Sequence, residues 1–151
     1  RKSFWPKGRF STLAGFLDIG ETLEQCIVRE TMEESGVSVD RNSIQFIASQ
    51  PWPFPNSFMV GFHATATPTA TTTTANDDDN ENSSLPPIHV DTDEMEDVQW
   101  FHKDYVASRL QGGSTALEQY KKSSDEEEEF HIPGKSSLAR ILITKWALGD
   151  N

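Results

Sequence analysis

The sequence predicts a single α+β domain whose helices and strands pack as αβα layers. Three observations favour this class: a well-capped helix over Leu23–Ser35, short strands of alternating apolar residues, and an amphipathic helix at the C-terminus. Helices and strands with one apolar face bury it by packing as layers. At 151 residues the chain is long enough for one such core.

The clearest predicted element is the helix, which follows a segment of strand and loop character. Residues 4–17 are apolar with interspersed Gly and Ser, as is typical of a strand and loop that lead into a helix. Thr22 and Gln25 then form the T-x-x-Q capping box that satisfies the free amides at a helix start. Gly36 supplies a left-handed C-terminal cap, so we expect the helix to end at Ser35.

Three short strands and a second helix complete the predicted domain. Residues 44–48 and 58–66 are expected to be strands, and the second alternates between two faces. Residues 97–102 predict a further short strand. The C-terminal helix is expected to begin at about Ser136. Its apolar face is formed by Leu138, Ile141, Leu142 and Trp146.

Two polar segments are expected to be exposed connections outside the core. About residues 65–87 and residues 111–129 contain few large apolar side chains, and the second has weak helical character. The apolar share of the whole chain is only 35%, and these segments account for much of the polar excess. We therefore expect one domain over residues 1–151 with two polar insertions.

The charge balance limits the partners of the protein. Its formal net charge is −11, with 24 acidic and 13 basic residues. Such a surface repels a nucleic-acid backbone, and a phosphate substrate needs a cation to approach it, which favours a divalent metal. The acidic runs are equally compatible with solvated loops.

Cysteine usage and the absence of long apolar runs favour an intracellular protein. Cys26 is the single cysteine, so the sequence contains no internal disulfide and no cysteine-rich zinc site. No signal peptide or membrane-spanning run is apparent, and we expect no membrane partner. We expect a cytoplasmic or peroxisomal location, although residues 148–151 are not a peroxisomal signal. Because residue 1 is arginine, we expect one domain of a longer protein.

Carboxylates lie on the inward face of the predicted helix. The apolar stripe that starts at Leu23 continues through Glu30 to Glu34 at helical spacing. Like charges on one stripe are costly unless a cation lies between them, and clustered hard oxygen ligands suit Mg²⁺ or Mn²⁺. The alternative is a solvated helix in which Arg29 pairs with Glu33.

Residues 15–37 resemble the Nudix box, G-x5-E-x7-R-E-U-x-E-E-x-G-U, in which U is a bulky aliphatic residue. The matching positions are Gly15, Glu21, Arg29, Glu30, Glu33, Glu34, Gly36 and Val37. The one departure is Thr31 at the first U position, a mild change because threonine is β-branched. The resemblance implies a Nudix hydrolase, built as an αβα sandwich with a mixed β-sheet.

The same resemblance implies a metal-dependent catalytic site. The implied ligands of Mg²⁺ or Mn²⁺ are Glu30, Glu33, Glu34, Glu94 and the backbone carbonyl of Ala14. Arg29 is expected to orient the glutamates, and Glu21 to support the loop. Glu34 is the candidate acceptor of a proton from the attacking water. In the later loop Glu94 is the first choice of ligand, and Glu96 is the second.

Residues 49–57, SQPWPFPNS, form a proline-rich aromatic segment. Three prolines at alternate positions forbid a helix, so we expect an extended, stiff loop. Trp52 and Phe54 then offer rigid faces for a flat ring next to the diphosphate site. Hydrogen bonds to that ring or to a ribose are expected from Gln50, Asn56 and Ser57. These residue types are equally compatible with a structural corner that only packs the core.

The segment also resembles the SQPWPFPxS signature of NADH pyrophosphatases. The implied reaction is hydrolysis of NADH or NAD⁺ to nicotinamide mononucleotide and AMP, and removal of NAD caps from RNA is a further option. Phe16 is expected to stack on a ring, and Ala139 to contact the nucleotide through its backbone. The implied substrate-binding residues are Gln50, Pro51, Trp52, Pro53, Phe54, Pro55, Asn56, Ser57, Phe16 and Ala139.

Several features stay open at this point. Members of that family usually carry an N-terminal domain and a zinc ribbon, which this sequence does not contain, and zinc is expected only there. They commonly form homodimers, and the Trp and Phe content here allows one. The alternative functions are a Nudix pyrophosphatase for ADP-ribose or another nucleoside diphosphate derivative, and a non-catalytic nucleotide-binding module.

Overall fold

The computed structural model describes residues 8–68, 85–111 and 131–149, and it confirms the α+β class. The first helix in the described residues is α1 (Leu23–Ser35), and the short 3₁₀ turn η1 (Arg41–Ser43) follows it. The strands β1 (Gln45–Trp52) and β2 (Ser57–His63) follow. Of the described helices, α2 (Lys103–Gln111) and α4 (Leu138–Leu148) come after the strands.

The helix α1 has the limits and the caps that its sequence predicts. The Thr22 hydroxyl accepts a hydrogen bond from the Gln25 N–H at 3.3 Å, and the Gln25 side chain accepts from the Thr22 N–H at 2.8 Å. At the other end Gly36 has φ 69°, and its N–H donates to the Met32 carbonyl. These bonds satisfy backbone groups that a helix leaves free at its ends.

The strands β1 and β2 form an antiparallel hairpin that includes most of the proline-rich segment. Pro51 lies opposite Phe58, and Trp52 lies opposite Ser57. The loop expected over residues 49–57 is therefore shorter, because β1 continues through Trp52 and only the residues between the strands turn. Proline is tolerated because each strand of a two-stranded sheet has an outward edge where no N–H is needed.

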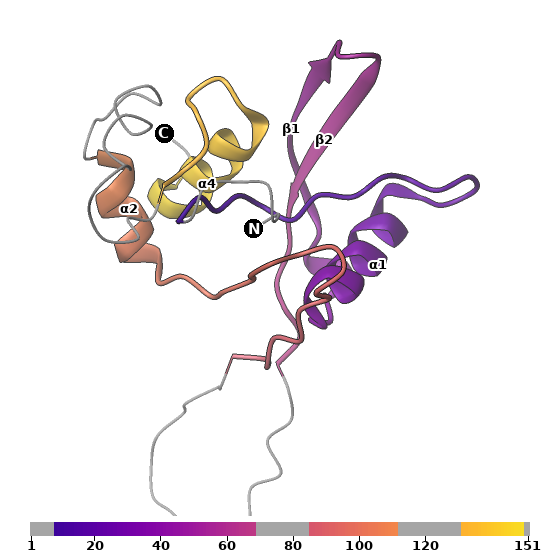
Figure 1. Ribbon diagram of the computed structural model, residues 1–151, viewed down its shortest axis with the longest axis horizontal. Coiled ribbons are helices and arrows are strands. Elements are labelled where there is room, and N and C mark those ends of the chain that lie inside the picture. The colour runs from indigo at the N-terminus through magenta and orange to yellow at the C-terminus, as the bar shows by residue number, and fades with distance from the viewer. Residues whose placement is uncertain (1–7, 69–84, 112–130, 150–151) are drawn as a thin grey trace, which may run out of the picture.

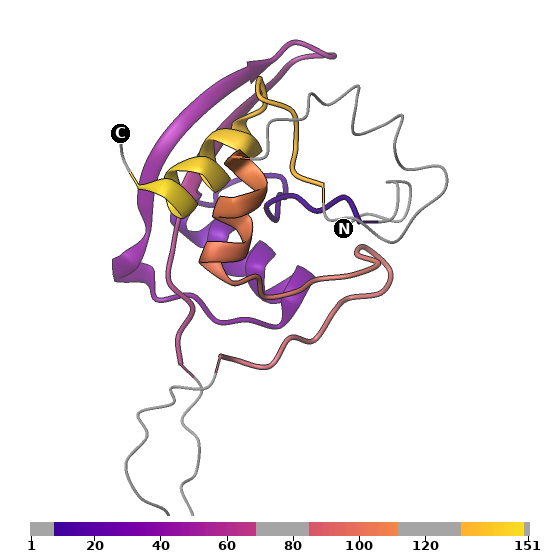
Figure 2. The same ribbon diagram turned by 90° about the vertical axis from the view of Figure 1, so that its left-hand side faces the viewer.

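The hairpin separates the helices into two groups. In Figure 1 α1 lies on one side of the strands and α2 and α4 on the other, and the quarter turn in Figure 2 brings α2 and α4 to the front. This arrangement agrees with αβα layers. The sheet in the described residues has two antiparallel strands, smaller than the mixed sheet expected.

The N-terminal segment forms only a single bridge where a strand is expected within residues 4–17. Arg9 pairs with His131 in parallel, so that the Phe10 N–H donates to the His131 carbonyl at 3.2 Å. The His131 N–H donates to the Gly8 carbonyl at 2.8 Å. Among the described residues this bridge is the one backbone pairing that is parallel. It joins the N-terminal segment to the segment before α4.

The helix α4 packs directly on the hairpin at Gly61, which is buried. A Cβ at this glycine would lie 2.9 Å from Leu142 Cδ2 and 3.2 Å from Leu138 Cδ1, so only glycine allows the approach. Leu138 and Leu142 are buried as predicted, while Ile141 and Trp146 are 38% and 42% exposed. The described residues therefore cover only part of the apolar face expected for this helix.

Residues 97–102 form no strand, contrary to the prediction. A strand needs a paired neighbour for its backbone, and in the described residues none lies beside this segment. Trp100 Nε1 instead donates to the Pro86 carbonyl at 3.0 Å. His102 Nδ1 accepts from the Asp104 N–H at 3.3 Å and so begins α2, a helix that the sequence did not predict.

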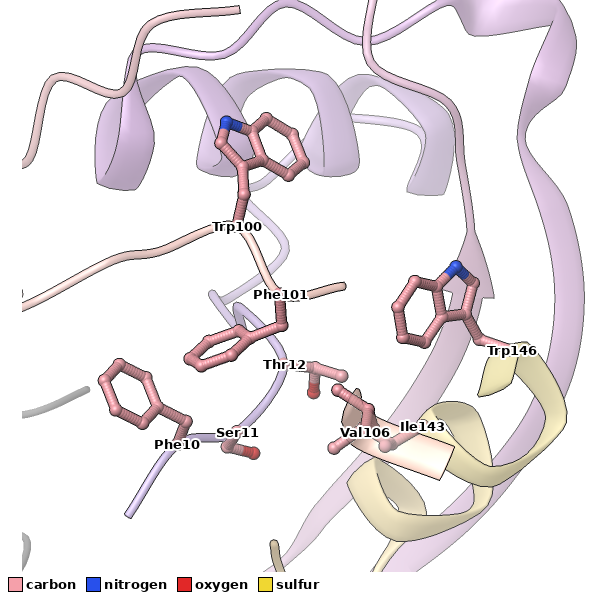
Figure 3. A pocket seen from close by; sticks show the side chains of 8 residues that line it. All are labelled: Phe10, Ser11, Thr12, Trp100, Phe101, Val106, Ile143 and Trp146. Carbon is pink, nitrogen blue, oxygen red and sulfur yellow. The ribbon is translucent and has the colours of Figure 1, made fainter. Parts of the chain in front are cut away.

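The core lies between α2, α4 and the N-terminal segment. Its buried centre is formed by Val106, Ile132 and Ala147. Phe10 and Phe101 meet edge to face, with ring centroids 4.9 Å apart. Both rings line a hollow of about 190 Å³. Figure 3 shows the side chains around it, with Trp100 and Trp146 among them. The walls of this hollow carry no titratable side chain among the described residues, so they supply no acid or base.

Most of the two expected insertions, about residues 65–87 and residues 111–129, lies outside the described residues. Only their ends, residues 65–68, 85–87 and 111, belong to the described part. None of the helices in the described ranges has the length and apolar character that crossing a bilayer requires.

Candidate active site

The side chain of Arg29 joins the loop before α1 to the glutamates on the helix. Its Nε and Nη2 donate to both carboxylate oxygens of Glu21 at 2.9 Å. Its Nη1 donates to Glu30 Oε1 at 2.9 Å and to Glu33 Oε2 at 3.0 Å. Its Nη2 also donates to the Phe16 carbonyl at 2.9 Å. One guanidinium therefore fixes the loop and two glutamates relative to each other.

These contacts hold both partners in their charged forms. The hydrogen bond from Arg29 lowers the pKa of Glu21 to about 2. The hydrogen bonds to Glu21, then those to Glu30 and Glu33, raise the pKa of Arg29 above its already high ordinary value. Both groups are ionised at neutral pH, so the contacts of Arg29 with Glu21, Glu30 and Glu33 form a network of charge-assisted hydrogen bonds, which we call the clamp.

Gly15 allows the loop to approach the helix. A Cβ at Gly15 would overlap the carboxylate of Glu30, so this carboxylate lies directly against the loop backbone. The Glu30 side chain is only 16% exposed as a result. Glycine is therefore needed here for steric reasons.

Glu34 is a buried carboxyl group at the C-terminal end of α1. It is 1% exposed, and its Oε2 accepts a hydrogen bond from the Ala14 N–H at 3.3 Å. A buried carboxylate is costly unless hydrogen bonds or a cation compensate it. Leu23 is 40% exposed and Glu30 is half-buried, so the predicted inward stripe is buried mainly at its C-terminal end. Glu33, on the adjacent row of the helix, is 54% exposed.

The segment that carries Glu94 starts at this same end of α1. The His89 N–H donates to the Ser35 carbonyl at 2.8 Å. Glu94 itself is exposed, and its N–H donates to the Asp91 carbonyl at 3.3 Å within a turn. In the described parts of the chain no hydrogen bond or ion pair joins Glu94 to the glutamates of α1, so its role as a ligand stays a prediction.

The aromatic turn between β1 and β2 lies away from α1. Figures 1 and 2 place this turn at the end of the hairpin that is remote from the helix. Trp52 and Phe54 are 48% and 75% exposed, and their rings meet edge to face with centroids 6.1 Å apart. The expected neighbourhood of these rings and the glutamates is therefore not formed within one chain. On the loop before α1, the Phe16 ring is 84% exposed.

Gln50 has a different environment from the one expected. Its Nε2 donates to the Ser136 carbonyl at 2.7 Å, and its Oε1 accepts from the Leu138 N–H at 2.8 Å. Both ends of the amide are thereby bonded to the start of α4, where Ala139 follows. Asn56 and Ser57 are exposed, as ligand-binding residues require. The sequence contains no signal for the Gln50 contacts, because their partners are 86 and 88 residues away.

A comparison with known protein families gives a match over most of the chain. The NUDIX domain family matches residues 1–121. The chain belongs to the NUDIX domain family. The loop, α1 and the clamp at Arg29 are therefore the NUDIX box of this domain.

Known relatives share similarity with almost the whole chain. NAD-capped RNA hydrolase NudC of Mycobacterium bovis is 37% identical over 147 residues, which are 97% of this chain and 39% of that protein. NAD(P)H pyrophosphatase NUDT13, mitochondrial, of Mus musculus is 40% identical over 148 residues, which are 97% of this chain and 36% of that protein. The Homo sapiens protein of the same name is 37% identical over 147 residues. The chain thus spans between 36% and 39% of the length of these relatives.

The glutamates of the NUDIX box have the donor chemistry that suits a hard divalent cation. Arg29 takes one oxygen of Glu30 and one of Glu33, and the other oxygen of each has no hydrogen bond within the described residues. Over residues 8–68, 85–111 and 131–149 no three Asp, Glu, His or Cys side chains converge into a finished metal site. The box fits a cation through the chemistry of its oxygen donors, because one oxygen of Glu30 and one of Glu33 remain available to a metal.

Proposed function

We propose that this NUDIX domain hydrolyses the pyrophosphate bond of NADH or NAD⁺ to nicotinamide mononucleotide and AMP. The observation that carries the proposal is the acidic set on α1, with Glu34 buried against Ala14 and Glu30 held over Gly15. The names of the relatives, NAD(P)H pyrophosphatase and NAD-capped RNA hydrolase, support a dinucleotide substrate. NADPH and NAD-capped RNA are further candidates on the same ground.

The box residues divide into metal ligands and positioning residues. The proposed ligands of Mg²⁺ or Mn²⁺ are Glu30, Glu33, Glu34, Glu94 and the Ala14 carbonyl. When bound, such a cation supplies charge neutralisation on the diphosphate and activation of water. Arg29 and Glu21 position the loop and the glutamates through the bidentate bond between them.

Hydrolysis needs one proton acceptor close to the attacking water. In the bond-breaking step the water oxygen bonds to phosphorus, the bond from phosphorus to the bridging oxygen breaks, and a proton of the water passes to a base. We assign this role to Glu34, because its Oε2 is held in place by the Ala14 N–H.

The rings of the dinucleotide are assigned to exposed aromatic side chains. Phe16 lies on the loop of the box, and Trp52 and Phe54 lie on the turn, whose shape is set by Pro51, Pro53 and Pro55. Polar contacts are assigned to Asn56, Ser57 and the backbone of Ala139. Because the turn and the box lie apart in one chain, a homodimer that brings the turn of one copy to the box of the other is part of this proposal.

We place the protein in a reducing, intracellular compartment. Cys26 is the single cysteine of the chain, and burial raises the pKa of its thiol. A thiol with a raised pKa stays protonated at neutral pH and is a poor nucleophile, which fits a packing role. The cytoplasm and the peroxisome both satisfy this condition.

Two other functions use fewer of these features. Hydrolysis of ADP-ribose or another nucleoside diphosphate derivative requires the box and not the aromatic turn. A non-catalytic nucleotide-binding module requires neither Glu34 in place nor a divalent cation. Every glutamate of the box is present here, which favours catalysis over the module.

The test is product analysis after incubation of the domain with NADH and Mg²⁺, with ADP-ribose and NAD-capped RNA in parallel. We expect AMP and reduced nicotinamide mononucleotide from NADH. Glu34→Gln should lower kcat by about 10²- to 10⁴-fold, the size of a lost general base. Glu24→Gln is the matched control, because Glu24 is an exposed carboxylate in the first turn of the same helix.

The outcomes separate the alternatives. Faster cleavage of ADP-ribose than of NADH would keep the NUDIX chemistry and overturn the dinucleotide assignment. No cleavage of any of the three substrates, with nucleotide binding intact, would favour the non-catalytic module. An equal loss of activity in both glutamate variants would remove the special role of Glu34.

A further inference from the structure

The side-chain amide of Gln50 makes two hydrogen bonds to the backbone at the start of α4, one as donor and one as acceptor. Nε2 donates to the Ser136 carbonyl at 2.7 Å, and Oε1 accepts from the Leu138 N–H at 2.8 Å. These two groups flank Ser137, the N-cap of α4, whose hydroxyl accepts from the Arg140 N–H. Gln50 thus satisfies one of the amides that a helix leaves free at its start.

In the described residues, Gln50 is one of the contacts that hold α4 on the hairpin, and it bonds to the two backbone groups that flank the N-cap of the helix. The helix packs against Gly61, and His63 Nε2 lies 3.0 Å from the Leu142 carbonyl. Those two contacts involve the side chains of Leu138 and Leu142 and the Leu142 carbonyl, and they fix the distance of α4 from β2. Packing of an apolar side chain such as Leu138 is not directional, whereas the two hydrogen bonds to Gln50 fix where the first turn of α4 lies along β1.

The same face of the hairpin carries part of the aromatic turn. Side chains two residues apart in a strand share a face, so the side chains of Gln50 and Trp52 lie on the face that α4 covers. Opposite residues share a face as well, which places Ser57, the partner of Trp52, on this side. Ala139, in the first turn of α4, follows directly after Leu138. Gln50 therefore links the first turn of α4 to the face of the hairpin that carries Trp52 and Ser57.

We propose that Gln50 is a positioning residue. It holds the first turn of α4 in register with Trp52 and Ser57, so that the backbone of this turn and the two side chains contact the same dinucleotide. The proposal rests on the proposed function, since that function supplies the ligand. It assigns no contact between Gln50 and the ligand, because both ends of its amide are already bonded. Substrate binding, rather than the chemical step, should depend on it.

The test compares Gln50→Glu and Gln50→Met with the same changes at Gln45, an exposed glutamine of the same strand. Glu keeps the acceptor for the Leu138 N–H and loses the donor to Ser136, and Met of similar length loses both. With NADH we expect KM to rise about tenfold for Gln50→Met and less for Gln50→Glu, with kcat within about threefold of the parent. Both Gln45 variants should match the parent domain.

A readout without substrate separates this proposal from the proposed function. The Leu138 amide should exchange slowly with deuterated water in the parent domain and at least tenfold faster in Gln50→Met, and should be unchanged in Gln45→Met. A Leu138 amide insensitive to Gln50 would overturn the tether even if NADH is hydrolysed. A loss in kcat with KM unchanged would show a purely structural role and would also overturn it. If the parent domain cleaves no NADH, the proposed function fails. The affinity for NADH, measured by calorimetry for the parent domain and for Gln50→Met, then decides whether Gln50 positions the residues that bind the dinucleotide.

Discussion

At the scale of single residues, Arg29 determines the geometry of the NUDIX box. Its guanidinium makes two parallel bonds to Glu21 and still reaches Glu30, Glu33 and the Phe16 carbonyl. Only arginine has this fork of donors, because a lysine ammonium cannot bond bidentately to one carboxylate while bonding to two others. A local ion-pair network of this kind adds rigidity where a diphosphate site needs fixed oxygens.

Acid should weaken the domain through Glu21. The hydrogen bond from Arg29 lowers its pKa in the folded domain to about 2, from an ordinary value of 4.5. As pH falls, the unfolded chain therefore takes up this proton first, so the stability from Glu21 is complete above about pH 4.5 and is lost between there and about pH 2. In urea unfolding across this window, we expect the free energy of unfolding to fall more steeply for the parent than for Glu21→Gln.

Glu24→Gln serves as the control for that comparison, because Glu24 is exposed on the same helix. Its pH dependence should follow that of the parent domain. A constant difference in stability between the parent and Glu21→Gln over the whole window would contradict a Glu21 pKa set by Arg29.

At the scale of elements, the hairpin and α4 are joined by close packing as well as by hydrogen bonds. The helix approaches β2 because position 61 has no side chain, and the tips of Leu138 and Leu142 occupy the space of the missing Cβ. A strand glycine is often the mark of such an approach. The position of α4 therefore depends on the size of one side chain on β2.

Gly61→Ala should destabilise the domain by about 1–3 kcal/mol, the usual cost of an added methyl group in a packed interface. The reason is that the new Cβ would lie 2.9 Å from Leu142 Cδ2, so the leucine or the helix must move. Urea unfolding measures the cost. The double variant with Leu142→Ala should be less destabilised than the sum of the two single variants, because removal of the leucine tip makes room for the methyl group. Additive costs would mean that α4 does not contact the hairpin at this point.

At the scale of the whole molecule, the negative charge and the acidic box act in the same direction. A net charge of −11 attracts cations to the surface in general, while the glutamates of α1 concentrate oxygen donors at one place. General attraction is screened by salt, and a specific site is screened much less. Binding of a divalent cation to the folded state alone must raise the stability of the domain.

Mg²⁺ should stabilise the domain even without substrate. At about 100 times its dissociation constant, a cation that binds only the folded state adds about 2.7 kcal/mol, which corresponds to a rise in Tm of several degrees. Thermal unfolding with Mg²⁺, at constant ionic strength set by NaCl, measures this rise. Glu30→Gln should reduce it, and Glu24→Gln should leave it intact. An equal rise in both variants would assign the effect to general charge rather than to the box.

The features that the sequence determined by itself are those that depend on neighbours within a few residues. The caps of α1 at Thr22 and Gly36 lie within one turn of the helix, and the prediction of its limits is confirmed. Helical spacing likewise brings Arg29 to Glu33 one turn away, whereas the bonds from Arg29 to Glu21 across the preceding loop were not predicted from spacing. Helical period and capping are local properties, so composition and spacing were sufficient.

The tertiary structure alone decided which distant segments meet. It turned residues 97–102 into a loop, because a strand forms only where a partner strand satisfies its backbone. It placed the aromatic turn away from α1, and it bonded Gln50 to the start of α4 across 86 and 88 residues of chain. Such contacts arise from packing the elements around one core, and no pattern within a short stretch of sequence contains them.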